Sequence, residues 1–198
     1  MNSQFKHICV IGLGYIGLPT AATFAAHGVK VTGVDVNQHA VDMINQGKVH
    51  IVEPDLDALV KVVVTKGMLA AQTVPAEADV YIVAVPTPFK DDHQPDLKYI
   101  ESAAKALAPY LKSGNLVILE STSPVGATEQ MSAWLSEARP DLTFPQQAGE
   151  ASDIRIAHCP ERVLPGKVLQ ELISNDRIIG GMTQPCSMAA SNLYKIFV

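Results

Sequence analysis

The chain has 198 residues, of which 47% are hydrophobic and 18% are charged, enough for one α/β domain with a full core and the beginning of a second. The net charge is −5 and the basic residues are scattered, which argues against a nucleic-acid or membrane-surface binder. No apolar run reaches the length of a membrane span and the N-terminus lacks the features of a signal peptide, so we expect a cytoplasmic protein.

Short apolar runs alternate with longer amphipathic segments along the chain. This alternation is typical of repeated β–α units and predicts a doubly wound, mostly parallel α/β sheet of the Rossmann type. In chain order we predict a strand at 7–12, a helix at 17–27, a strand at 30–36, helices at 37–46 and 57–66, strands at 68–73 and 80–85, a helix at 97–111, a strand at 115–120, a helix that begins near Pro124, a loop at 139–153, a strand at 154–159, a helix at 168–173, a strand at 177–180 and a helix from about Cys186.

We divide the chain on this basis into a domain at 1–183 and the beginning of a helix at 184–198. The final segment LYKIFV has an apolar helical face without a capping residue, so this helix is expected to lead to a further region.

The segment GLGYIG at 12–17 follows the first predicted strand and opens the first predicted helix. In this setting a GxGxxG motif indicates a dinucleotide site. The first glycine permits a tight turn, the second lets the backbone approach a pyrophosphate, and the third allows the helix to pack closely on the strand. We expect the cofactor to contact Gly12, Gly14, Tyr15, Ile16 and Gly17.

Asp35 ends the second predicted strand, 18 residues after Gly17. A carboxylate at this position accepts both hydroxyl groups of an adenosine ribose and repels a 2′-phosphate, which favours NAD over NADP. The alternative interpretation is that the glycines only make turns and that Asp35 only caps the following helix. The predicted cofactor is therefore NAD.

Neither the cysteines nor the histidines have the spacing of metal ligands. Cys9, Cys159 and Cys186 form no CxxC pattern, so three reduced thiols are expected, with Cys159 a small buried hydrophobic residue. No metal site is expected among the histidines, which are His7, His27, His39, His50, His93 and His158.

Three further segments carry a resemblance to a known family. VAVPTP at 83–88, ESTSPVGAT at 120–128 and CPERVLPGKVLQELISNDRIIGG at 159–181 are together similar to the nucleotide-diphosphosugar 6-dehydrogenases, which include UDP-glucose dehydrogenase. The resemblance covers essentially the whole chain. PERVLPG and the loop HIVEPDL at 50–56 further resemble the branch that acts on UDP-N-acetylhexosamines. Pro165 stands where the UDP-glucose branch has an acid, which disfavours UDP-glucose as the substrate.

The resemblance implies oxidation of the sugar C6 alcohol to a carboxylate, with two NAD⁺ and one water consumed. It favours UDP-N-acetyl-D-mannosamine as the substrate, whose uronic acid product would serve a surface polysaccharide such as enterobacterial common antigen; UDP-N-acetylglucosamine is the alternative. In the family a cysteine thiolate adds to the aldehyde, and water hydrolyses the thioester formed by the second oxidation. That cysteine lies in a glycine-rich segment that these residues lack, so Cys159 is not expected to be the nucleophile.

The resemblance also implies roles for residues of this chain. Thr122 is expected to hydrogen-bond a catalytic water, and Glu161 to help deprotonate the water that attacks the thioester. Glu120 is expected near the nicotinamide, with Pro86 and Thr87 along the ribose and pyrophosphate of the cofactor. Without the resemblance, Glu161 would be interpreted as a solvated carboxylate and Thr122 as a helix-capping hydroxyl.

Several alternatives stay open at this point. A β-hydroxyacid or 6-phosphogluconate-like dehydrogenase shares the GxGxxG motif, but its substrate-loop signatures are missing here. The isolated chain is also expected to act as an NAD-binding module without turnover. The resemblance implies a parent homodimer, with the helical and C-terminal domains of the family, and the helix that joins the two subunits, expected beyond Val198. Arg162 and Lys167 could meet a pyrophosphate, but charges on a loop are more often solvated.

Overall fold

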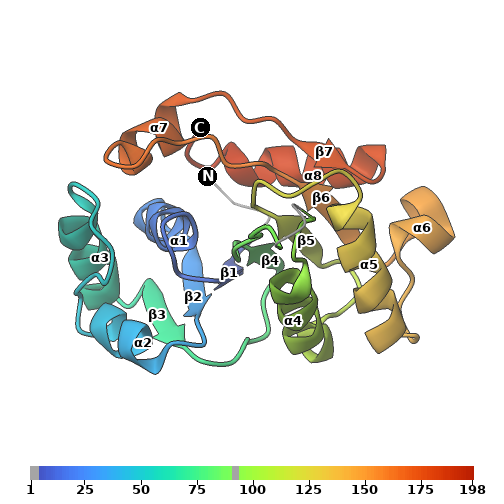
Figure 1. Ribbon diagram of the computed structural model, residues 1–198, viewed down its shortest axis with the longest axis horizontal. Helices are drawn as coiled ribbons and strands as arrows, with labels where there is room; N and C mark the ends of the chain where they lie inside the picture. The colour runs from blue at the N-terminus through green and yellow to red at the C-terminus, as the bar shows by residue number, and fades with distance from the viewer. Residues whose placement is uncertain (1–4, 91–93) are drawn as a thin grey trace.

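The computed structural model describes residues 5–90 and 94–198. Their strands form one seven-stranded sheet in the order β3-β2-β1-β4-β5-β6-β7, shown in Figure 1. All neighbouring strands are parallel except β6 and β7. The strands are β1 (His7–Ile11), β2 (Lys30–Val34), β3 (Leu69–Gln72), β4 (Val80–Val83), β5 (Leu116–Leu119), β6 (Arg155–His158) and β7 (Gly180–Gly181). The prediction of a doubly wound, mostly parallel sheet is confirmed.

Helices cover both faces of this sheet. They are α1 (Gly17–Ala26), α2 (Gln38–Asn45), α3 (Leu56–Thr65), α4 (Lys98–Leu107), α5 (Ala127–Ala138), α6 (Pro145–Ala148), α7 (Val168–Ser174) and α8 (Gln184–Tyr194), with 3₁₀ turns η1 (Ala108–Tyr110) and η2 (Gly149–Ala151). Apolar residues of α1, α2, α3 and α8 form one core cluster against the sheet, and those of α4 and α5 form the other. No helix among the described residues is both long enough and apolar enough to span a bilayer.

The central strands are apolar throughout because both of their faces are covered. All four residues of β4 and all four of β5 are buried, as expected for parallel strands between two helical layers. The strands β1, β2 and β3 follow one another toward one edge of the sheet, and β4 then pairs with the opposite side of β1. This reversal leaves a crevice beyond the carboxyl ends of β1 and β4, where open α/β sheets bind ligands.

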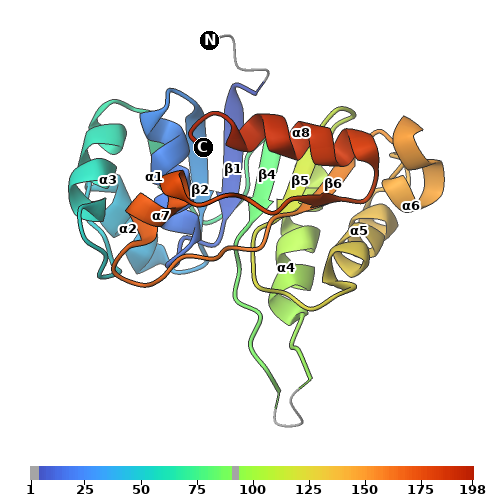
Figure 2. The same cartoon turned by 90° about the horizontal axis from the view of Figure 1, so that it is seen from above.

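The helix α8 lies across the sheet on the same side as α1 (Figure 2). It contacts β5, β6 and β7, and its last turn brings Tyr194 within 6.0 Å of the Phe24 ring. Phe197 packs edge-on against Phe24 at 4.7 Å. The helix predicted from about Cys186 is therefore present, whereas the proposed division at residue 183 and a further region after it stay predictions.

Two predicted segments are corrected by the structure. The predicted loop at 139–153 contains α6 and η2, because Pro145 suits the first turn of a helix and the side chain of Phe144 is fully buried. The predicted strand at 177–180 is reduced to Gly180–Gly181, antiparallel to β6. Continued pairing would set residues 177–179 against 159–161, and Pro160 has no N–H to donate there.

Candidate functional site

A cleft of about 780 Å³ opens at the carboxyl ends of the parallel strands. Its walls come from the loop between β1 and α1, the end of β2, and the loops that follow β4, β5 and β6. Ten of the residues predicted for the site line this cleft, namely Gly12, Gly14, Tyr15, Ile16, Asp35, Pro86, Thr87, Glu120, Thr122 and Glu161. Gly17 is buried beneath the glycine loop and does not line it.

Each glycine of the motif meets a different constraint. Gly12 has a φ of +91°, and a Cβ there would lie 2.6 Å from the carbonyl oxygen of Ala84. A Cβ on Gly17 would overlap the carbonyl oxygen of Gly12. No described atom lies within 4 Å of a Cβ on Gly14, which faces the cleft. The protein itself therefore does not require glycine at this position, whereas a ligand pressed against the loop would.

Asp35 ties the glycine loop to the end of β2. Its Oδ2 accepts the backbone N–H of Leu13 at 2.9 Å, and its Oδ1 accepts that of Asn37 at 2.9 Å. Asn37 is the residue whose side chain caps α2. The interpretation of Asp35 as no more than a helix cap is therefore wrong, and each of its oxygens keeps a lone pair for a hydroxyl donor.

The loops after β4 and β5 meet in the cleft. Thr87 donates its hydroxyl to the carbonyl oxygen of Thr122 at 3.3 Å. The side chain of Thr122 is exposed, and no described side chain caps α5, so the interpretation of Thr122 as a helix cap is also wrong. Ser121 and Glu120 lie next to it, and Ser121 Oγ and Glu120 Oε2 are buried without a partner in the described part of the chain. Unpartnered buried polar atoms in a cleft are typical of a ligand site.

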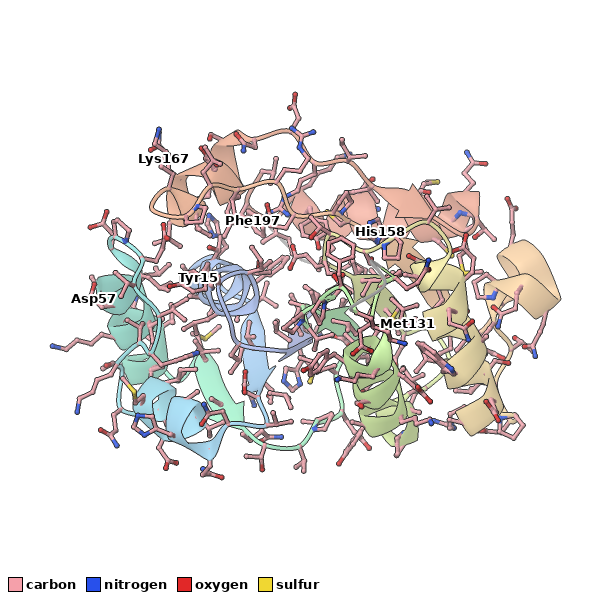
Figure 3. All side chains as sticks on the ribbon, viewed as in Figure 1. Tyr15, Asp57, Met131, His158, Lys167 and Phe197 are labelled. Atoms are coloured by element: carbon pink, nitrogen blue, oxygen red, sulfur yellow. The ribbon has the colours of Figure 1, made fainter. Side chains whose placement is uncertain are left out.

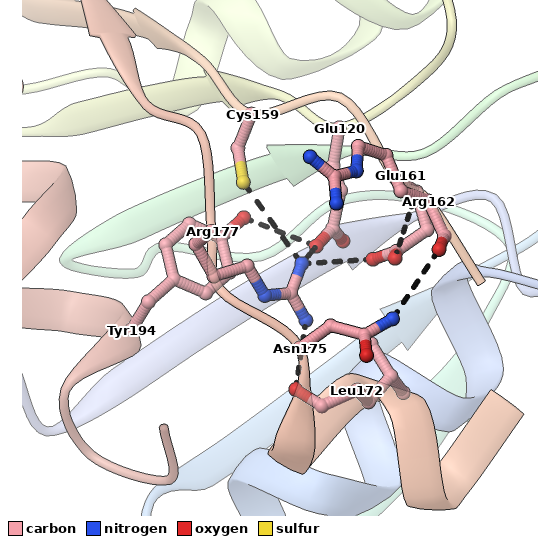
Figure 4. Close-up of polar contacts among 8 residues, drawn as sticks. All are labelled: Glu120, Cys159, Glu161, Arg162, Leu172, Asn175, Arg177 and Tyr194. Atoms are coloured by element: carbon pink, nitrogen blue, oxygen red, sulfur yellow. Dashed lines mark hydrogen bonds and ion pairs between the residues drawn. The ribbon is translucent and has the colours of Figure 1, made fainter.

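Glu161 is held firmly rather than solvated. It is 9% exposed, and Oε1 accepts the backbone N–H of Arg162 at 2.7 Å. Its Oε2 accepts Nη1 of Arg177 at 2.8 Å (Figure 4). The interpretation of Glu161 as a solvated carboxylate is wrong, because both of its oxygens have a fixed donor within the protein.

Glu120 is a fully buried residue of the cleft and shares the partner Arg177 with Glu161. Its Oε1 accepts Nη1 of Arg177 at 3.2 Å and the hydroxyl of Tyr194 at 3.1 Å. Burial raises the pKa of Glu120 to about 7; the charge of Arg177 opposes this rise and that of Glu161 adds to it. Glu120 therefore gains or loses a proton near neutral pH, which an exposed carboxylate does not do.

Sequence reasoning missed Arg177, Tyr194 and Ser121. Arg177 lies in the DRIIGG stretch of the segment that carried the family resemblance, and that position was the only available signal. Arg162 and Lys167, which were weighed instead, are exposed and do not line the cleft. Figure 3 shows Lys167 on the outer edge of the molecule, away from Tyr15.

Cys159 has the character expected of a buried hydrophobic residue. It is fully buried, and burial raises the pKa of its thiol to about 11, which keeps the thiol neutral at physiological pH. Neutral thiols are poor nucleophiles. Across 5–90 and 94–198, no three histidine, cysteine or acidic side chains are grouped to hold a metal ion; His93 lies outside the described residues.

The fold and the cleft define a dinucleotide-binding domain. The model of the UDP-glucose/GDP-mannose dehydrogenase family, NAD binding domain, matches residues 6–198. The chain therefore belongs to this family, as its NAD-binding domain.

Relatives of known name agree with this assignment. The chain is 68% identical to the UDP-N-acetyl-D-mannosamine dehydrogenase of Campylobacter jejuni over 99% of its length and 48% of that protein's. It is 67% identical to an NDP-N-acetyl-D-galactosaminuronic acid dehydrogenase of Ralstonia nicotianae, over 100% of this chain and 47% of that protein. The solved UDP-N-acetyl-mannosamine dehydrogenase of Staphylococcus aureus superposes with a TM-score of 0.89 at 42% identity, covering 97% of this chain and 45% of that one. The chain thus spans about half the length of these relatives.

Proposed function

We propose that the chain supplies the NAD⁺-binding part of a nucleotide-sugar 6-dehydrogenase that oxidises UDP-N-acetyl-D-mannosamine to its uronic acid. The observation that carries this proposal is that one cleft gathers the glycine loop, the carboxylate of Asp35 and the acid pair Glu120 and Glu161. Two carboxylates on the β5 and β6 side of the cleft are suited to proton transfer, which cofactor binding alone does not require. The similarity to relatives with this named activity supports the same conclusion.

The residues present fit NAD⁺. The glycine loop and the N-terminus of α1 would receive the pyrophosphate, and Asp35 would accept the adenosine ribose hydroxyls. Pro86 and Thr87 would pack along the cofactor toward Glu120. When bound, the cofactor accepts a hydride at each oxidation stage.

The catalytic roles that we propose fall at the other end of the cleft. Thr122 would hydrogen-bond a water molecule, and Glu161 would take a proton from the water that hydrolyses the covalent intermediate. Glu161 is suited to this task because its carboxylate is fixed and lines the cleft. The nucleophilic cysteine is not assigned to this chain, since its cysteines are buried.

Few contacts in the substrate pocket would decide the configuration of the hexosamine. Relatives named for mannosamine and for galactosaminuronic acid are 68% and 67% identical to the chain, so identity does not separate them. UDP-N-acetylglucosamine differs from UDP-N-acetyl-D-mannosamine in the placement of the C2 amide, and UDP-N-acetylgalactosamine differs also in that of the C4 hydroxyl, so a few pocket contacts decide between them. UDP-N-acetylglucosamine and UDP-N-acetylgalactosamine are therefore the alternatives.

Calorimetry and a turnover assay on the full native polypeptide that carries this chain test the proposal. We expect NAD⁺ to bind, NADP⁺ to bind at least about tenfold more weakly, and Asp35→Ala to weaken NAD⁺ binding. NADH should form with UDP-N-acetyl-D-mannosamine and to a lesser extent with UDP-N-acetylglucosamine and UDP-N-acetylgalactosamine. Binding of NAD⁺ without NADH from any nucleotide sugar would contradict the proposed activity. The homodimer and the cytoplasmic location stay predictions.

A further inference from the structure

Arg177 joins two buried carboxylates at the edge of the cleft (Figure 4). Its Nη1 atom donates to Glu161 at 2.8 Å and to Glu120 at 3.2 Å. The three side chains are almost fully enclosed, with 8% of Arg177, 7% of Glu161 and none of Glu120 exposed. Both acids line the cleft, whereas Arg177 does not. Arg177 can therefore act on a ligand only through the two acids.

Other contacts fix the guanidinium of Arg177 independently of these acids. Its Nη2 atom donates to the carbonyl oxygen of Leu172 in α7 at 3.4 Å. Its central carbon lies 4.8 Å from the centre of the Tyr194 ring and 5.6 Å from that of Phe197. Aromatic faces attract a buried cation and exclude water from it. The position of Arg177 is thus set by α7 and by the end of α8.

A positive charge is needed where these two carboxylates converge. Two buried carboxylates that approach the same point repel each other unless a cation lies between them. Arginine suits this place because it does not release its proton in proteins. Glu161 also accepts the backbone N–H of Arg162 at 2.7 Å, so each of its oxygens has one donor. This arrangement fixes the plane of the carboxylate and leaves a lone pair on each oxygen for water in the cleft.

We propose that Arg177 is a positioning residue that holds the Glu161 carboxylate toward the cleft by donating directly to it. This inference rests on the proposed function, because Arg177 acts through the base Glu161. The rival explanation is that Arg177 only balances the buried charge of Glu120. The two explanations differ once Glu120 is made neutral, because charge balance is then no longer needed whereas the position of Glu161 still is.

The test compares Arg177→Lys, Arg177→Met and the double variant Glu120→Gln/Arg177→Met in the full native polypeptide. Glu120→Gln alone is the reference for the double variant. Arg139→Met is the matched control, because Arg139 also pairs with an acid, Asp141 at 2.7 Å, and donates to two backbone carbonyls, but does not line the cleft. Thermal unfolding, the Kd of NAD⁺, kcat and KM are measured for each variant.

We expect Arg177→Met to unfold at a lower temperature, and the double variant to regain only the part of that loss that comes from the unpaired charge of Glu120. The kcat of the double variant should stay at least about 100-fold below that of Glu120→Gln, because a misplacement of about 1 Å in a catalytic group has effects of this size. The Kd of NAD⁺ should match that of Glu120→Gln. Arg177→Lys should regain part of kcat, and Arg139→Met should lose stability while keeping the kcat of the native protein.

Recovery of kcat in the double variant to the value of Glu120→Gln would overturn the inference, as would full kcat in Arg177→Met. A crystal structure of the double variant separates this failure from failure of the proposed function. If the native protein oxidises no nucleotide sugar, the proposed function is wrong. In that case the crystal structure of the double variant still tests the inference. The inference is wrong if the Glu161 carboxylate keeps its native position without Arg177, and it is supported if the carboxylate is displaced.

Discussion

At the scale of single residues, Gly14 differs from the other two glycines of the motif, because a ligand and not the fold requires a glycine there. Gly12 and Gly17 are constrained by neighbouring backbone atoms, whereas a Cβ on Gly14 would meet only open space in the cleft. Its φ also lies outside the positive region that disfavours side chains. The absence of a side chain at Gly14 is therefore explained by close approach of the cofactor rather than by folding.

Gly14→Ala is accordingly expected to fold with unchanged thermal stability and to lose NAD⁺ affinity at least tenfold, or about 1.4 kcal/mol. Gly17→Ala is the matched comparison, because the same methyl group there would overlap the Gly12 carbonyl and destabilise the protein. Calorimetry and thermal unfolding of both variants check the prediction. Native affinity for NAD⁺ in Gly14→Ala would contradict it.

Glu120 couples stability to pH near neutrality. Its pKa is about 7 in the folded protein against an ordinary value of 4.5, so the folded state binds more protons than the unfolded state between these values. The stability that this group contributes is present below the lower value and is lost as pH rises through the higher one. The full loss is about 3 kcal/mol.

Glu120→Gln removes this titration while keeping an oxygen acceptor for Arg177 and Tyr194. We expect the native protein to lose stability relative to the variant between about pH 5 and about pH 8. The difference between the two denaturation curves isolates Glu120 from His7 and His158, whose pKa values are lowered mainly by burial. Curves that run parallel over this range would show that Glu120 does not titrate there.

At the scale of elements, the loop that carries Glu161 is held in place by hydrogen bonds to a segment that is distant in the sequence. Glu53, in the loop before α3, is 7% exposed and accepts the backbone N–H groups of Gly166 at 2.8 Å and Val168 at 2.7 Å. Glu171 of α7 accepts the N–H of Leu164 at 2.8 Å. These carboxylates give the loop after β6 a defined path although it contains no regular structure before α7.

Glu53→Gln should loosen this loop, because an amide offers one acceptor oxygen and turns its own N–H groups toward the other donor. The expected cost is about 1–3 kcal/mol. Amide hydrogen exchange should become faster at Gly166 and Val168 and stay unchanged in β4 and β5. Asp57→Asn, an exposed acid in the first turn of α3, is the control. An unchanged rate of hydrogen exchange at both amides in Glu53→Gln would mean that Glu53 does not hold the loop.

At the scale of the whole molecule, the cleft lies between the two halves of the sheet. Its walls come from β1 and β2 on one side and from β4, β5 and the loop after β6 on the other, so a bound dinucleotide would contact both halves. A ligand that binds only the folded state stabilises the whole protein by mass action.

NAD⁺ at about 100 times its Kd should therefore add about 2.7 kcal/mol to the free energy of unfolding. For a domain of this size this corresponds to a rise in Tm of about 5–10 °C. NADP⁺ at the same concentration should produce little change, because Asp35 repels its 2′-phosphate. Thermal scans with each cofactor make the measurement, and equal shifts would contradict the assignment of Asp35.

The sequence by itself determined the sheet, the glycine loop and Asp35. Each depends on local patterns: the alternation of apolar periods, and a motif whose strand, turn and helix are consecutive in the chain. The family resemblance added Glu120, Thr122 and Glu161, and the structure brings all three to the same cleft. Their chemical roles stay predictions.

Only the tertiary structure decided which groups surround these acids. Arg177 and Tyr194 reach Glu120 across 57 and 74 residues of chain, through the packing of β5, α8 and the segment before β7. The strand at 177–180 was wrong for a related reason, because its pairing depended on Pro160 in a partner segment. Local spacing carries no information on contacts made by folding distant segments together. The burial that raises the pKa of Glu120 to about 7, and the charges placed around it, therefore emerge only from the packed molecule.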